Sequence, residues 1–154
     1  MPARARPQLS LKARALRYLS QREHSRAELT RKLAPHAQDA EEVSRVLDEL
    51  QSRGFIDHQR VAESVVHRRS SKLGLLRIKQ ELQAIGIEPQ HADAALAQLR
   101  ATELQRARDV WRRKFDGVAT DAAGRAKQAR FLAARGFSGD VIRRIIDGRA
   151  EDVG

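Results

Sequence analysis

The chain has 154 residues, no cysteine and a net charge of +10, since 30 lysines and arginines stand against 20 acidic residues. The missing cysteine excludes disulfides, cysteine-based zinc sites and thiol nucleophiles, and no apolar run approaches the roughly 20 residues that span a bilayer. The positive excess predicts a polyanionic partner, and nucleic acid is the commonest one in the cytosol.

The composition favours helices, because Ala, Leu, Arg, Gln and Glu dominate and aromatic residues make up only 4%. Residues 1–8 are expected to form a flexible basic arm. This arm lacks the apolar segment of a signal peptide, so a cytoplasmic location is expected. Residues 9–56 are predicted to form three helices. Caps and helix breakers bound the second and third of them: Ser25 with Glu28, Pro35, Asp39 and Gly54.

The same plan recurs in residues 57–100 and in residues 101–148, and a flexible C-terminus is expected at residues 149–154. Apolar side chains spaced by three or four positions predict three helices in each of these two repeats. The expected helices are residues 57–71, 75–86, 89–99, 104–115, 121–136 and 138–146.

The register of three leucines shows that the pattern is a repeat. Leu33, Leu82 and Leu132 occupy equivalent places, 49 and then 50 residues apart, and Gly86-Ile87 matches Gly136-Phe137 at a spacing of 50. Repeats of this length stack, because one unit alone does not bury its apolar face. The sequence therefore predicts an all-α fold of three tandem three-helix repeat units in an elongated body.

No arrangement of residues typical of an enzyme is present, so we expect no catalytic activity, cofactor or metal. The five histidines show neither the four-residue spacing nor the clustering of metal ligands, and each is expected at the surface. These histidines are His24, His36, His58, His67 and His91. Phosphate-binding glycine loops are absent as well.

Basic residues are spread over all three repeats, with net charges of +4, +2 and +4. This distribution suits contact with a long polyanion better than a single recognition helix. The candidate nucleic-acid-binding or filament-binding residues are Arg68, Arg69, Lys72, Arg77, Arg112, Arg113 and Lys114. Arg69 falls within an apolar arc, so it either extends its charge to solvent or pairs with a buried acid. Trp111 continues a core stripe and is interpreted as core.

Two other functions remain open from the residues alone. Capped helix pairs, such as residues 25–34 with 39–54, could belong to a helix-turn-helix transcriptional regulator. A helical adaptor that binds an acidic protein would also carry this charge.

Three segments resemble the RecX family, the bacterial regulators of the RecA recombinase. They are Gly54-Phe55-Ile56-Asp57 with Arg60-Val61-Ala62, Arg77-Ile78-Lys79-Gln80-Glu81-Leu82 with Gly86-Ile87, and Lys127 to Phe137 ahead of Val141-Ile142. The resemblance covers roughly residues 9–148. The chain departs from the family pattern at His58, at Val61 and in Ser71-Lys72-Leu73-Gly74.

The resemblance implies a curved, elongated, basic body of three-helix units whose partner is the RecA filament on single-stranded DNA, with double-stranded DNA as a further candidate. It also implies a non-enzymatic regulator of homologous recombination, DNA repair and the SOS response. Such a regulator suppresses the ATP hydrolysis, strand exchange and coprotease activities of RecA. It has no cofactor and no membrane association, and a monomer is expected.

Overall fold

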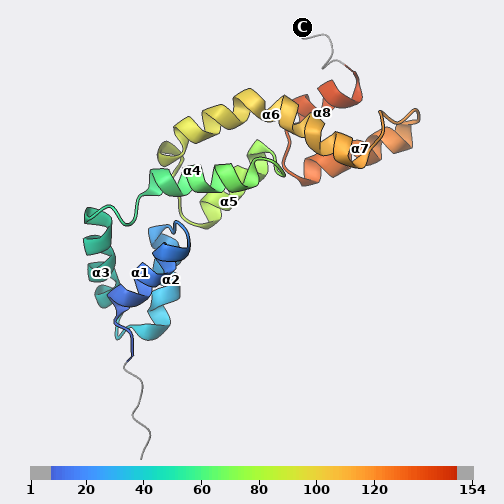
Figure 1. The fold of residues 1–154 in the computed structure, drawn as a ribbon. Helices are drawn as coiled ribbons and strands as arrows, with labels where there is room; N and C mark the ends of the chain where they lie inside the picture. The colour runs from blue at the N-terminus through green and yellow to red at the C-terminus, as the bar shows by residue number, and fades with distance from the viewer. Residues whose placement is uncertain (1–7, 149–154) are drawn as a thin grey trace, which may run out of the picture. The chain divides into compact units, whose positions relative to one another are not determined.

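The computed structural model describes residues 8–148, and within that range all regular structure is helical (Figure 1). The chain divides into two compact units, which are described separately: unit 1 ends at Val61 and unit 2 begins at Ala62. Most of the expected arm at residues 1–8, and all of the expected C-terminal segment at residues 149–154, lie outside the described residues. No helix in residues 8–148 is long and apolar enough to cross a bilayer.

Unit 1 contains the three predicted helices of the first repeat. They are α1 (Leu11–Gln21), α2 (Arg26–Leu33) and α3 (Ala40–Ser52), with a short 3-10 turn, η1 (Ala34–His36), between the last two. The predicted caps are confirmed. Ser25 and Glu28 form a complete capping box, and Asp39 accepts a hydrogen bond from the Glu42 amide. Local sequence therefore sets where α2 and α3 begin.

The apolar faces of these three helices meet in one core. Its buried members are Leu11, Ala15, Leu29, Leu33, Val43, Leu47, Leu50 and Ile56. Leu33, the first of the three register leucines, is fully buried here. The repeat register thus marks a core position rather than a surface one.

His24 contradicts the prediction that every histidine is at the surface, because its side chain is only 1% exposed. It lies between α1 and α2, where Ser25 is also buried. The ring nitrogen Nδ1 is 3.0 Å from the Arg22 carbonyl oxygen, and Lys32 Nζ is 3.0 Å from Nε2. This geometry fits a neutral ring that donates through Nδ1 and accepts through Nε2. Sequence reasoning missed it because the buried turn follows from the packing of α1 against α2.

The neutral state of His24 makes the stability of unit 1 depend on pH. Burial lowers the pKa of His24 below its ordinary value of 6.5, and the positive charges of Arg22 and Lys32 act in the same direction. The hydrogen bond to the Arg22 carbonyl and the charge of Glu28 oppose this shift. Below pH 6.5 the unfolded chain therefore takes up a proton before the folded chain does, and stability falls.

We expect the free energy of unfolding to decrease between about pH 7.5 and about pH 5.5, with a slope of at most about 1.4 kcal/mol per pH unit from this one group. Urea unfolding at the two pH values measures the effect, and the variant His24→Asn should show a flatter profile. The pKa of Glu28 is also lowered, from an ordinary value of 4.5, so its contribution is lost only in a more acidic range. An equal pH dependence in wild type and variant would contradict the assignment.

Unit 2 holds the remaining helices. In chain order they are α4 (His58–Arg69, which begins in unit 1), α5 (Leu75–Ala84), the 3-10 turn η2 (Pro89–His91), α6 (Asp93–Lys114), α7 (Ala122–Ala134) and α8 (Gly139–Ile146). Asp121 and Ser138 cap α7 and α8, each accepting a backbone hydrogen bond, where the helices over residues 121–136 and 138–146 were predicted to begin.

The two helices expected over residues 89–99 and 104–115 are a single helix, α6, of 22 residues (Figure 1). The separation was wrong because residues 100–103 contain neither glycine nor proline, so nothing in the backbone stops the helix. Pro89 begins η2 rather than the α-helix. The proposed boundary between the second and third repeats, after Arg100, therefore falls inside a continuous helix.

The two halves of α6 pack against different helices. The first half contacts α5 and η2, and the second half packs with α7 and α8. A core around the second half contains Ala107, Val110, Leu132, Phe137, Val141, Ile142, Ile145 and Ile146. Trp111 packs against this core, which confirms its interpretation, and its indole N–H is 3.4 Å from Gln128 Oε1.

Candidate nucleic-acid interface

A close contact between two glycines joins the second and third repeats within unit 2. The Gly74 amide donates to the Arg135 carbonyl oxygen at 2.8 Å, and the Leu76 amide donates to the Gly136 carbonyl oxygen at 3.0 Å. A Cβ on Gly74 would overlap the backbone of Gly136 and Phe137. The start of α5 is therefore held directly against the end of α7.

A buried carboxylate on α6 supports the same contact. Glu103 is 5% exposed, and its Oε1 lies 3.4 Å from the Leu75 amide and 3.3 Å from the Ser138 amide. These amides lie at the N-termini of α5 and α8, where backbone N–H groups lack helical partners and the helix dipole favours negative charge. One side chain thus stabilises the first turns of helices from two repeats.

Arg106, also on α6, fixes the connection between α4 and α5. Its guanidinium donates to the carbonyl oxygens of Ser70 at 2.9 Å and Leu73 at 2.7 Å, and to that of Leu99 at 3.0 Å. Burial lowers its pKa from the ordinary value, opposed by the charge of Glu103. We assign Arg106 a structural role, which its position in the sequence did not indicate.

All seven predicted binding residues lie in the first or last turn of a helix of unit 2 or in the α4–α5 connection. All except Arg69 are exposed. Arg113 Nη1 lies 3.5 Å from the Ser71 carbonyl oxygen, so the last turn of α6 is beside the α4–α5 connection that carries Lys72. Arg77 lies beside Gly136, because a Cβ there would overlap the Cβ and amide of Arg77.

Arg69 forms an ion pair, which was one of the two alternatives left open by its sequence position. Its Nη2 lies 2.8 Å and its Nε 3.1 Å from the two carboxylate oxygens of Glu81, and both side chains are partly exposed. The hydrogen bonds to Glu81 and the charge of that carboxylate raise the pKa of Arg69. Since Glu81 compensates its charge, Arg69 attracts a polyanion less than an unpaired arginine does.

The Phe131 ring brings one further cation, Arg135, next to the predicted residue Lys114. The Arg135 guanidinium carbon lies 3.8 Å from the centre of the Phe131 ring, and Lys114 Nζ lies 4.9 Å from the same centre. Phe115 meets Phe131 edge-on at 5.2 Å. Arg135 was absent from the predicted set, although the segment Lys127 to Phe137 that carried the family resemblance contains it.

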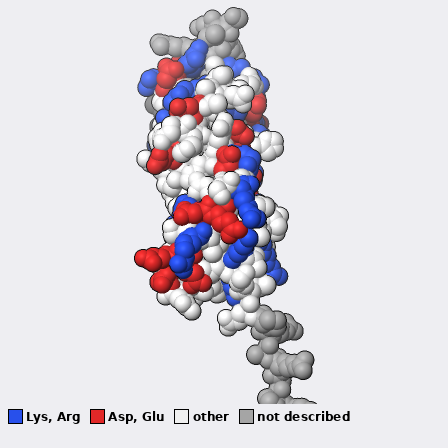
Figure 2. Space-filling view, turned by 90° about the vertical axis from the view of Figure 1, so that its left-hand side faces the viewer, with Lys and Arg blue, Asp and Glu red and all other residues white. Residues whose placement is uncertain are grey.

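These contacts define a joint cluster of cations around the Gly74–Gly136 contact. Its members are Lys72, Arg77, Arg113, Lys114 and Arg135, together with Arg112, which lies in the same last turn of α6 as Arg113 and Lys114. Among the described residues, no contact links the side chain of Arg68 to this cluster. Figure 2 shows that on one face of the molecule Lys and Arg side chains lie among Asp and Glu side chains rather than in one continuous basic field. Net charge alone therefore does not locate the interface.

Residues 8–148 contain no group of three or more histidine or acidic side chains placed to hold a metal ion. The buried carboxylate of Glu103 accepts backbone hydrogen bonds, as described, and serves the packing of helices.

Family models of the first, second and third three-helix domains of RecX match residues 12–50, 57–96 and 101–146, respectively. A regulatory protein RecX of Leptothrix cholodnii is 56% identical over 141 residues, which cover 92% of this chain and 90% of that protein. A regulatory protein RecX of Ralstonia nicotianae is 53% identical over 143 residues, covering 93% and 90%.

Solved structures agree with the fold. A crystal structure of regulatory protein RecX has a TM-score of 0.75 at 26% identity, covering 89% of this chain and 71% of its own. The crystal structure of RecX from Lactobacillus salivarius has a TM-score of 0.78 at 24% identity, covering 92% and 95%. The relatives are named regulatory proteins rather than enzymes. The resemblance seen in the three sequence segments is therefore confirmed, and this chain belongs to the RecX family, with three three-helix domains in tandem.

Proposed function

We propose that this protein is a non-enzymatic regulator that binds the RecA filament on single-stranded DNA in the cytoplasm. There it inhibits ATP hydrolysis, strand exchange and coprotease activity, and so restrains recombination and the SOS response. Membership of the RecX family supports the partner. The observation that carries the proposal is the joint cluster, where five exposed cations and Arg135 come together from α5, α6, α7 and the α4–α5 connection.

The joint cluster has the chemistry that a nucleic-acid backbone selects. Lysine and arginine side chains neutralise phosphates and release counterions, which supplies affinity without sequence preference. The glycine contact, Glu103 and Arg106 hold the supporting helix ends in place, so less conformational entropy is lost on binding. Arg69 is expected to contribute less than its neighbours because Glu81 compensates it.

Titration into preformed RecA filaments on single-stranded DNA tests the proposal. We expect the rate of ATP hydrolysis to fall progressively as the protein is added, and the effect to weaken as salt is raised, because the contacts are ionic. Binding to bare single-stranded DNA of unrelated sequences should be similar. A rate of hydrolysis that stays constant at every concentration would contradict the proposal, and operator-like sequence preference by a dimer would favour a transcriptional regulator instead.

A further inference from the structure

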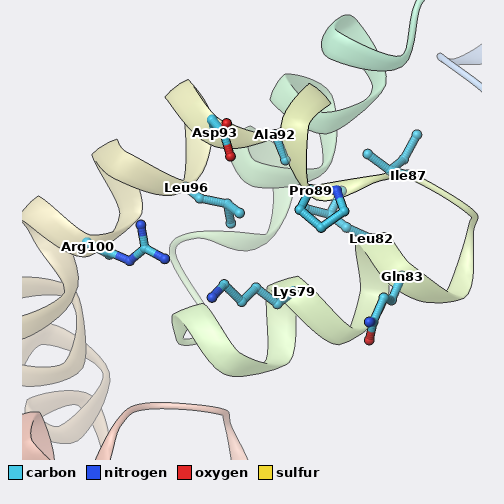
Figure 3. A pocket seen from close by; sticks show the side chains of 9 residues that line it. All are labelled: Lys79, Leu82, Gln83, Ile87, Pro89, Ala92, Asp93, Leu96 and Arg100. Atoms are coloured by element: carbon cyan, nitrogen blue, oxygen red, sulfur yellow. The ribbon is translucent and has the colours of Figure 1, made fainter.

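A cavity of about 300 Å³ lies between α5 and the first half of α6, and no joint cluster residue lines it (Figure 3). Its inner wall is aliphatic and includes the buried side chains of Leu82, Ile87 and Leu96. This volume is at the lower end of the range for ligand sites and fits one large apolar side chain with its neighbours. The cavity is thus a recess with an aliphatic inner wall and polar side chains at its edge, formed by the helices of the second repeat.

Two cations border this recess. Lys79 from α5 and Arg100 from α6 are exposed, and their nitrogen-bearing ends point toward one another in the space between the two helices, near Leu96 (Figure 3). Neither has a side-chain ion pair among the described residues, in contrast to Arg69 on α4. An anion between Lys79 and Arg100 would therefore gain two charged contacts without breaking an existing pair.

The residues that line the cavity favour some anionic ligands over others. None of the nine lining residues is aromatic, so a nucleobase would find no ring on which to stack. Asp93 adds a carboxylate at the first turn of α6, which accepts hydrogen bonds from the amide groups of a peptide. An aliphatic recess between two cations and one acceptor is complementary to an acidic peptide that carries a large apolar side chain.

We propose that this pocket is a docking site for a short acidic segment of a partner protein, in which a leucine-like or phenylalanine-like side chain lies next to a carboxylate. The apolar side chain enters the recess against Leu82 and Leu96, and the carboxylate lies between Lys79 and Arg100. This site is separate from the joint cluster, and it stands whether or not the protein inhibits RecA.

Fluorescence anisotropy with the full chain tests the pocket. The probe is a fluorescein-labelled peptide, Gly-Asp-Glu-Leu-Asp-Gly, and two further probes replace its leucine by serine or its acidic residues by lysine. We expect saturable binding of the first probe, weakened by salt, and clearly weaker binding of the serine probe. The double variant Lys79→Glu/Arg100→Glu should lose at least about tenfold in affinity for the first probe and gain affinity for the lysine probe.

The matched control is Lys127→Glu/Arg130→Glu, which makes the same change in charge on the exposed face of α7. It should bind the first probe nearly as well as wild type does. The proposal is overturned by absence of saturable binding up to about 1 mM peptide, or by equal losses in the two double variants. It is also overturned if Lys79→Glu/Arg100→Glu impairs only the binding of oligothymidylate, since the pocket would then serve nucleic acid.

Discussion

Replacing Gly136 by alanine is expected to lower the free energy of unfolding of unit 2 by about 3 kcal/mol or more. Two costs add at this position. Its φ of +88° lies in the left-handed region, where a Cβ is strained. The added Cβ would also overlap the Cβ and the amide of Arg77 at the start of α5. Urea unfolding followed by circular dichroism measures the loss.

Three further glycines of unit 2 separate these two costs. Gly74→Ala adds only an overlap with the Gly136 backbone, and about 2 kcal/mol is expected. Gly148→Ala adds only the strain of a φ of +73°, since no atom of the described residues lies within 4 Å of its Cβ, and about 1 kcal/mol is expected. Gly117→Ala has neither cost and should be neutral or slightly stabilising. Equal losses for Gly136→Ala and Gly148→Ala would show that the glycine contact contributes nothing.

Reversing the charges of Arg112, Arg113 and Lys114 to glutamate is expected to reduce affinity for single-stranded DNA by roughly a hundredfold at about 0.1 M salt. These residues form the exposed last turn of α6, next to the α4–α5 connection. Losing three phosphate contacts should also flatten the salt dependence, lowering the slope of log K against log salt by about 2. Filter binding over a salt series measures both, and inhibition of RecA-driven ATP hydrolysis should weaken in parallel.

A matched triple reversal distinguishes local contacts from net charge. Arg17, Arg31 and Arg45 are exposed in unit 1, and their reversal takes the net charge from +10 to +4, as the first variant does, because each change removes two positive charges. Its binding should stay within a few-fold of wild type. A glutamine version of the α6 triple avoids placing acids at a helix C-terminus and controls for stability. If both reversals weaken binding equally, or if the α6 variant inhibits RecA undiminished, the joint cluster is not the interface.

Local sequence determined where most helices begin. Ser25 and Asp39 cap their helices as predicted, and Asp121 and Ser138 cap helices at their predicted starts, because a cap needs only a side-chain oxygen within reach of the next three backbone amides. Leu33, Leu82 and Leu132 are all buried, so the repeat register also identified core positions. These features depend on residues that are close together in the chain, so a single sequence is enough to predict them.

The errors arose where contacts between distant segments decide the outcome. From the sequence the turn that contains His24 was expected to be exposed, but the packing of α1 against α2 buries it. The break predicted in α6, between residues 99 and 104, lies where the helix changes from packing on α5 to packing on α7 and α8. The pattern of apolar residues shifts when one helix changes its packing partner, just as it shifts when one helix ends and another begins.

The sequence by itself determined the helical class, the repeat, most caps and the basic character of the chain. Only the tertiary structure decided which cations act together. It pairs Arg69 with Glu81, places Arg135 on the Phe131 ring beside Lys114, and leaves Lys79 and Arg100 at a recess with an aliphatic inner wall. The reason is physical: helix formation depends on residues three or four apart, whereas the charge available to a ligand depends on side chains brought together from different helices.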